Sequence, residues 1–249
     1  NSSPLNVLIL EETFWEVSKR LLAVTTISVN WKASAVNFYG EDVTQAEVEA
    51  YYASLDKVEK NQPEYGLNTR LVKQDGKIVA QTYKVGGLYT EAIEKIVFWL
   101  EKAIPLAENE QQKVTLERLV NYYKTGDVAD WDQYNLAWIK DTASVTDVVN
   151  GFIEVYNDPL GKKGSFESVV SFKDMEATKR IEAVSKEAQW FEDNSPLMEE
   201  HKKPNVTGII GKVITVVVEA GDASPSTPIG INLPNNGWVR ETGSKSVSL

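Results

Sequence analysis

Two residues at the end of an apolar stretch could bind charged groups. In Phe152-Ile-Glu-Val-Tyr156, Glu154 precedes Tyr156 by two residues, so on a strand both side chains share one face. A carboxylate can bind an ammonium group, and a phenol can donate a hydrogen bond to an oxyanion. The same spacing also fits a half-exposed strand whose Glu and Tyr face water, and spacing alone favours that interpretation.

A second stretch offers two side-chain amides. Asn232 and Asn235 lie within Gly230-Ile-Asn-Leu-Pro-Asn235. Their carbonyl oxygens, together with one carboxylate, would match the three N–H donors of an amine. Asn residues that cap their own backbone in a turn explain this stretch equally well. Because Pro228 and Pro234 cannot donate to a ladder, the segment is predicted at a sheet edge, where an extended peptide could add as a strand.

The residue counts exclude several kinds of catalytic site within this chain. It contains no cysteine and a single histidine, His201. Disulfides, thiolate zinc sites and cysteine nucleophiles are therefore excluded, and HExxH needs two histidines. His201 lies in a charged run, which is typical of a solvated surface.

Charge and hydropathy limit the partners. The net charge of −10 over 249 residues gives no basic footprint, so neither nucleic acid nor an anionic membrane is expected as a partner. A cationic group would be attracted. The strongest apolar run, Lys212–Val218, is far shorter than the roughly 20 residues that span a bilayer. A cytoplasmic location is the expectation.

The periodicity predicts an α+β fold in which helices come first and a mostly antiparallel β-sheet or β-barrel core follows. Asp75-Gly76 predicts a type I′ hairpin between residues 68–74 and 77–85. Thr44 and Glu47 have the spacing of a capping box, and Thr90 is expected to cap a helix. The predicted helices are Leu5–Val24, Gln45–Lys60, Thr90–Ala103, Glu108–Lys124, a shorter one carrying Trp131 and Trp138, and Glu176–Phe191. The predicted strands include Ser34–Tyr39, Val169–Phe172 and Lys212–Val218.

Several motifs in collinear order resemble the dipeptidyl peptidase III family. Residues 151–161 match its GFIE-x-Y-x-DP-x-G segment, and residues 230–235 match GIN-x-PN. The K-x-VSL segment follows at Lys245–Leu249. Shorter matches occur at residues 68–71 and 138–141. The resemblance covers about residues 33–249, and residues 1–32 stay an unassigned helical segment.

The resemblance implies a zinc-dependent enzyme that removes dipeptides from the N-terminus of short peptides. In that family two lobes close on a cleft, and one lobe holds zinc through HExxGH and a distant glutamate. This chain matches the other, substrate-binding lobe, so zinc is expected in the full-length enzyme and none is expected to be bound by this chain. We therefore expect the isolated chain to be inactive.

The resemblance also assigns roles to individual residues. Glu154, Asn232 and Asn235 would bind the free amine of the peptide, and Tyr156 would be catalytic by donating a hydrogen bond to the carbonyl oxygen of the scissile bond. The peptide backbone would pair with Ile229, Gly230, Ile231, Asn232 and Leu233.

The implied partners are short peptides with a free N-terminus and the missing zinc-binding lobe. An excursion at about residues 174–206 would pack toward that lobe; without the lobe its apolar face would be exposed, refolded or used in a dimer contact. Two functions of other classes stay open. The chain could be a stand-alone peptide-binding module, or a structural module without a ligand.

Overall fold

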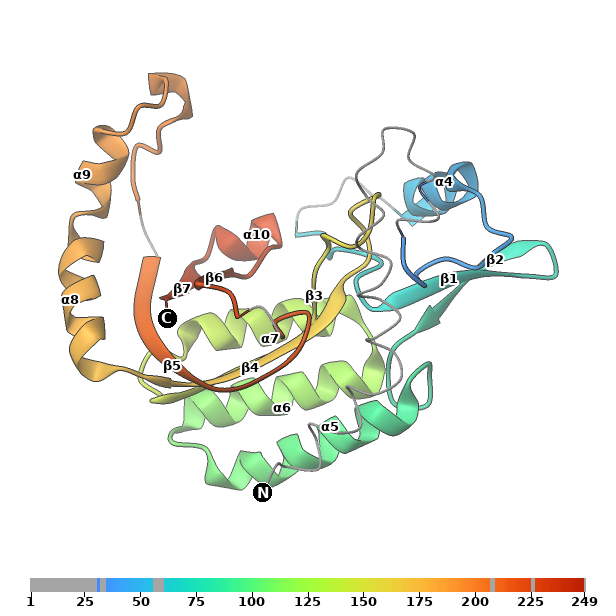
Figure 1. The fold of residues 1–249 in the computed structure, drawn as a ribbon, viewed down its shortest axis with the longest axis horizontal. Coiled ribbons are helices and arrows are strands. Elements are labelled where there is room, and N and C mark those ends of the chain that lie inside the picture. The colour runs from blue at the N-terminus through green and yellow to red at the C-terminus, as the bar shows by residue number, and fades with distance from the viewer. Residues whose placement is uncertain (1–30, 32–34, 56–60, 207–208, 225–226, 249) are drawn as a thin grey trace.

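A five-stranded sheet with three helices packed against one face forms most of the chain (Figure 1). It is seen in a computed structural model that describes residues 31, 35–55, 61–206, 209–224 and 227–248. The fold is α+β, as predicted. The predicted helix Leu5–Val24 lies outside the described residues.

The sheet is mixed and open. Its spatial order is β3 (Thr146–Glu154), β4 (Ser165–Lys173), β5 (Ile209–Gly221), β7 (Ser244–Ser248) and β6 (Gly230–Leu233). All neighbours are antiparallel except β5 and β7, which are parallel. The pairing leaves β3 and β6 as edges, so in the described residues the expected barrel-like core is an open sheet. The prediction that the segment around residues 228–234 lies at a sheet edge is confirmed by β6.

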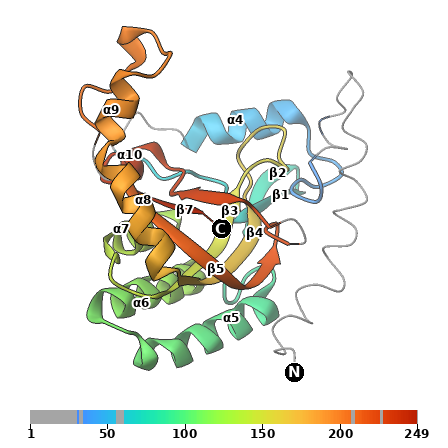
Figure 2. The same ribbon diagram turned by 60° about the vertical axis from the view of Figure 1, so that its left-hand side comes forward.

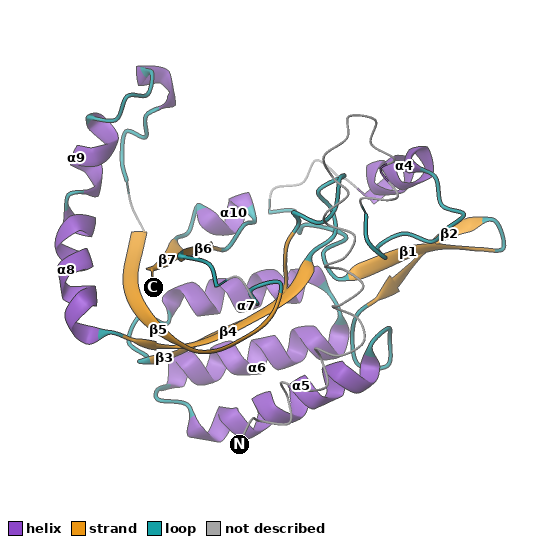
Figure 3. Ribbon diagram, viewed as in Figure 1, coloured by secondary structure: helices purple, strands orange, loops and turns teal. Residues whose placement is uncertain are grey.

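Three helices cover one face of this sheet (Figure 3). Local capping signals explain where two of them begin. Asn109 accepts a hydrogen bond from the Gln112 N–H, and Asp127 accepts one from Ala129. The layer consists of α5 (Thr90–Ala103), the 3₁₀ turn η2 (Ile104–Leu106), α6 (Glu110–Thr125) and α7 (Val128–Lys140).

A smaller unit precedes the sheet and has its own apolar cluster. It contains α4 (Gln45–Leu55) and the hairpin β1 (Thr69–Gln74) and β2 (Lys77–Thr82). The type I′ turn is confirmed, since Asp75 and Gly76 both have positive φ, 49° and 74°. The Thr44–Glu47 capping box is also confirmed: the Thr44 N–H donates to Glu47 over 2.9 Å, and the Glu47 N–H donates to Thr44 Oγ1 over 3.4 Å.

Three local predictions are wrong. The strand expected at Ser34–Tyr39 is a turn over its described residues, closed by the Phe38 N–H to the Ala35 carbonyl. Thr90 does not cap α5, because its hydroxyl accepts from the Gly86 N–H instead.

The third wrong prediction is the single helix expected over residues 176–191. This helix breaks at Glu187, where φ is −94° and ψ is 12°. The two parts are α8 (Met175–Lys186) and α9 (Ala188–Asp193), followed by η3 (Glu199–His201). Figures 1 and 2 show α8 beside β5 and α9 extending past the end of the sheet. This excursion exposes Met175, Val184, Trp190, Phe191, Leu197 and Met198.

No helix in the described part of the chain is long and apolar enough to cross a membrane.

A buried ionic cluster connects the edge strand β3 with β7 and with helix α7. Asp147 on β3 accepts from Lys245 on β7 over 3.1 Å and from the Trp138 indole N–H over 2.7 Å. Lys212 on β5 lies 3.5 Å from the same carboxylate. Lys245 is fully buried with its Nζ 4.3 Å from the Trp138 ring centroid, and burial lowers its pKa to about 8. The cluster therefore fixes β7, and with it the neighbouring edge strand β6.

Candidate functional site

Glu154 and Asn235 meet although they are 81 residues apart in sequence. Glu154 is the last residue of β3, and Asn235 follows the edge strand β6. Asn235 Nδ2 donates to Glu154 Oε2 over 3.1 Å. Because the N–H side of the amide faces the carboxylate, Asn235 Oδ1 remains as an acceptor for a donor from outside.

A bulge fixes the end of β3. Phe152 pairs with Phe166, yet Glu154 already pairs with Ser165, so Ile153 is an extra residue in the strand. Phe152 and Ile153 are both buried in the main core. The two buried side chains anchor the strand end and leave Glu154 half-buried at its rim.

Tyr156 does not lie on the strand, which corrects the idea that it shares a strand face with Glu154. β3 ends at Glu154, and Tyr156 lies in a turn in which the Asp158 N–H donates to the Val155 carbonyl over 3.0 Å. The Tyr156 side chain is 81% exposed. Its pKa is nonetheless raised, chiefly by the negative charge of Glu154. The two side chains are thus neighbours because of the turn.

The remaining predicted residues belong to β6 and its approach. Leu233 is buried, Ile231 packs against the main core, and Gly230 and Asn232 are exposed in alternation with them. Ile229, just before the strand, is 86% exposed. The Asn232 side chain therefore stands on the face opposite Leu233, with no hydrogen bond to Glu154 or Asn235 among the described residues. Among the described residues, the backbone of β6 pairs with β7 on one side and has no strand on the other.

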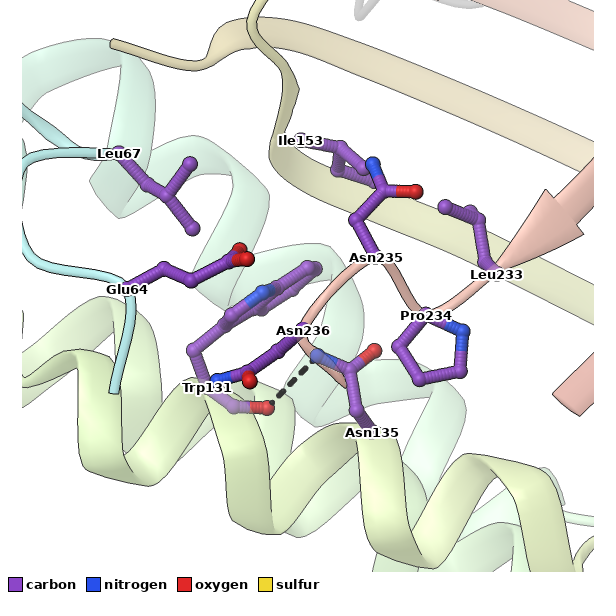
Figure 4. A pocket seen from close by; sticks show the side chains of 9 residues that line it. All are labelled: Glu64, Leu67, Trp131, Asn135, Ile153, Leu233, Pro234, Asn235 and Asn236. Carbon is purple, nitrogen blue, oxygen red and sulfur yellow. Dashed lines mark hydrogen bonds between the residues drawn. The ribbon is translucent and has the colours of Figure 1, made fainter. Parts of the chain in front are cut away.

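A small pocket lies beside Asn235 (Figure 4). Glu64 points into it from one side, and residues 233–236 form the opposite wall, with Trp131 between them. Burial raises the pKa of Glu64, and the charge of Glu154 adds to the effect. Other lining side chains are Leu67, Asn135 and Ile153.

Asp132 on α7 holds the segment that carries Asn235. This carboxylate is 1% exposed and accepts from Asn236 Nδ2 over 3.1 Å and from the Trp238 indole N–H over 3.3 Å. Trp238 belongs to the short helix α10 (Gly237–Arg240). Burial raises the pKa of Asp132 to about 7, although both hydrogen bonds oppose the shift.

Further carboxylates surround Glu154. The pKa of Glu167 on β4 is raised to about 7, mainly by burial and then by the charges of Glu154 and Asp222. Burial also raises the pKa of Asp222, which accepts from Asn157 Nδ2 over 3.2 Å. The site is therefore electronegative, and a bound ammonium group would relieve the repulsion among these groups.

The part of the chain that the structure describes shows no group of three or more His, Cys, Asp or Glu side chains able to hold a metal ion. The zinc implied by the resemblance does not fit these residues.

Comparison with known proteins decides the lineage. The family description "Peptidase family M49" matches residues 14–249. This chain belongs to peptidase family M49. The match includes β3 with Glu154, the turn with Tyr156, and the β6 segment with both asparagines.

Curated M49 relatives are considerably longer than this chain. "Dipeptidyl peptidase 3" of Dictyostelium discoideum is 28% identical over 236 residues, which are 85% of this chain and 33% of the relative. "Dipeptidyl peptidase 3" of Rattus norvegicus is 34% identical over 173 residues, 66% of this chain and 22% of the relative. The chain thus spans between about a fifth and a third of these two relatives.

A solved M49 structure shares the fold. Dipeptidyl peptidase III from Caldithrix abyssi superposes with a TM-score of 0.72 at 28% identity, covering 87% of this chain and 41% of that chain. The enzyme from Corallococcus sp. strain EGB gives 0.71 at 27% identity, covering 87% and 40%.

Sequence reasoning missed several residues around the Glu154–Asn235 contact. Asn236 directly follows the segment at residues 230–235, so its position gave a signal. Glu64 and Asp132 had none, because only the fold brings the segment before β1 and one face of α7 to Asn235.

Proposed function

We propose that this chain is the substrate-binding part of a zinc metallopeptidase that releases dipeptides from the N-terminus of short peptides. The proposal rests on the Glu154–Asn235 contact beside a strand edge that is unpaired in the described part of the chain. The relatives' names, dipeptidyl peptidase, agree with a site that binds the free amine of a peptide and so sets cleavage after the second residue.

The peptide's ammonium group would bind between the Glu154 carboxylate and the carbonyl oxygens of Asn232 and Asn235. One anion and two neutral acceptors match three N–H donors. The other carboxylates around Glu154 add a favourable potential for a cation. Peptides that lack a free amine would leave Glu154 unpaired.

The peptide backbone would lie along the free edge of β6. Extended peptides add to such edges through main-chain hydrogen bonds, and Ile229 offers an exposed apolar side chain at the start of the strand. A peptide in this register would run from the amine site past Tyr156.

Tyr156 would donate its hydroxyl hydrogen bond to the carbonyl oxygen of the scissile bond. The phenol is protonated at neutral pH, and the nearby Glu154 carboxylate raises its pKa further. Losing one donor to a developing oxyanion typically costs about 2.7–4 kcal/mol. Water activation would come from zinc in the rest of the enzyme, so we propose that this chain alone does not cleave peptides.

The apolar surface of the α8–α9 excursion has a proposed role as well. It would pack against the part of the polypeptide by which the M49 relatives exceed this chain, since six large apolar side chains stand exposed there. Pairing of two copies is the competing outcome. Sedimentation velocity of the chain from low to high concentration would show a monomer in the first case and a concentration-dependent dimer in the second.

Calorimetric titration of the chain with a short peptide tests the amine site. The free-amine peptide should bind the unaltered chain, and Glu154→Gln should weaken that binding by about tenfold or more, the effect of losing a charged hydrogen bond. An N-acetylated peptide should bind both proteins equally. Glu91→Gln, an exposed carboxylate on α5, is the charge-matched control. Equal losses for the free and the acetylated peptide would remove Glu154 from the amine site.

A further inference from the structure

The loop between β3 and β4 carries Tyr156 in its first turn. The Tyr156 side chain is 81% exposed, so packing does little to hold its ring. Its hydroxyl interacts with the Glu154 carboxylate, and the backbone of the turn sets the position of the ring relative to that carboxylate. The turn is closed by the Asp158 N–H to the Val155 carbonyl. Asn157 Nδ2 attaches this turn to β4 by donating a hydrogen bond to Ser165 Oγ over 2.8 Å.

Asp158 organises the rest of the loop. Its carboxylate is buried, with the residue 5% exposed, and it accepts from the backbone N–H groups of Leu160, Lys162 and Lys163 over 3.2, 2.8 and 2.9 Å. One carboxylate thus folds five consecutive residues around itself. Hydrogen bonds to an ionised acceptor are among the stronger ones in proteins.

A tyrosine from the smaller unit completes this arrangement. The Tyr39 hydroxyl donates to Asp158, with its oxygen 2.9 Å from Oδ2 and 3.1 Å from Oδ1. Tyr39 is 6% exposed and bridges to Leu71 of β1. It is therefore held by a packed cluster, and the hydrogen bond crosses 119 residues of sequence.

Lys163, in the same loop as Asp158, also attaches the loop to the smaller unit. Lys163 is fully buried, and its Nζ donates to Thr69 Oγ1 over 2.7 Å. The ammonium also lies over the rings of Tyr39 and Tyr52, 5.6 and 5.1 Å from their centroids. Burial lowers the pKa of Lys163 to about 7, although the charge of Asp158 opposes the shift. Below that pH the buried Asp158 carboxylate therefore has a buried cation beside it.

We propose that the Tyr39–Asp158 hydrogen bond positions Tyr156 for its contact with the scissile carbonyl, which makes Tyr39 and Asp158 positioning residues of the peptidase. The inference rests on the proposed function, because it needs Tyr156 to act on the substrate. An exposed ring on a tethered turn keeps its place only while the tether holds. Displacement of a reacting group by about 1 Å can cost about 100-fold in rate.

The test is a double-mutant cycle in the full-length zinc enzyme that contains this chain. Tyr39→Phe removes only the hydroxyl and keeps the packed ring. We expect it to lower kcat by about tenfold with KM within about twofold, since the contact with Tyr156 matters most in the transition state. In a Tyr156→Phe background the same change should cost less than about twofold, because the group that it positions is already gone.

Tyr52→Phe is the matched control. Tyr52 is 3% exposed in the same cluster, and in the described structure its hydroxyl donates no hydrogen bond to Asp158. Its loss should leave kcat unchanged. Should Tyr39→Phe lower the melting temperature so far that the enzyme is not folded in the assay, Asp158→Asn takes its place in the cycle.

Three results would overturn the proposal. Tyr39→Phe could leave kcat unchanged while Tyr156→Phe lowers it, the two losses could multiply fully in the double variant, or Tyr52→Phe could cost as much as Tyr39→Phe. If Tyr156→Phe itself leaves kcat unchanged, the role of Tyr156 in the proposed function fails, and positioning fails with it.

Discussion

Asn235 points the N–H side of its amide at Glu154, with 3.1 Å between Nδ2 and Oε2. The contact joins the bulged end of β3 to the loop after the edge strand β6. It orients both groups before any ligand arrives: one carboxylate oxygen is engaged, and the amide oxygen is left for a donor. A preformed site of this kind loses little conformational freedom when it binds.

Removing the Asn235 amide should weaken the binding of a peptide with a free amine. Asn235→Ala deletes an acceptor worth about 0.5–1.5 kcal/mol, so the dissociation constant of a free-amine peptide should rise about two- to tenfold. Asn194→Ala, at an exposed asparagine after α9, is the control. Calorimetric titration measures both. Unchanged affinity in Asn235→Ala would show that this amide does not contact the peptide.

The buried ionic cluster around Asp147 should be sensitive to loss of the Asp147 carboxylate. Asp147→Ala would leave Lys245 and Lys212 buried without the carboxylate they share, and breaking a buried pair in this way typically costs about 3–5 kcal/mol. Urea unfolding measures the change. Glu101→Ala removes the partner of Lys124 in an exposed pair and should cost less than about 1 kcal/mol. Similar losses for the two variants would contradict the importance assigned to burial.

Asp132 should make stability fall as pH rises. Its pKa is 3.8 in an ordinary setting and about 7 in the folded chain. Between about pH 4 and 7 the folded state keeps a proton that the unfolded state releases, so the free energy of unfolding decreases across this window. Asp132→Asn cannot titrate and should lose this part of the decrease. Urea unfolding at several pH values gives the difference between the two proteins, and a difference that is constant from pH 4 to 7 would be inconsistent with the raised pKa.

Gly151 should not tolerate a side chain. A Cβ at this position would lie 2.5 Å from Trp131 Cη2, so Gly151→Ala must displace the indole ring and should cost about 1–3 kcal/mol. Gly237→Ala faces open space and should change stability little. Thermal unfolding compares them, and a Gly151→Ala chain as stable as the unaltered one would show that Trp131 yields freely.

Local signals predicted those parts of the fold that depend on neighbouring residues. The Asp75-Gly76 turn needs positive φ at both positions, and the Thr44–Glu47 box closes within one helical turn. The edge position of β6 followed from its prolines. Ser34–Tyr39 failed because a hydrophobic alternation does not reveal a turn closed by backbone hydrogen bonds, with Val36 at a φ of 51°.

The site was predictable only in part, for the same reason. Motif order pointed to Glu154 and Asn235, and their contact is present. The buried partners that hold the site, Asp132 and the Tyr39–Asp158 pair, come from segments far apart along the chain. Nothing local marks a carboxylate as buried, so long-range contacts of this kind appear only in the folded structure.

The crystal structure of this chain with a short free-amine peptide tests the central claim most directly. We predict that the peptide's terminal nitrogen lies about 2.7–3.2 Å from a Glu154 oxygen and from Asn235 Oδ1, with the peptide backbone extended along the free edge of β6. A peptide bound in the opposite direction, or bound with its amine away from Glu154, would contradict it.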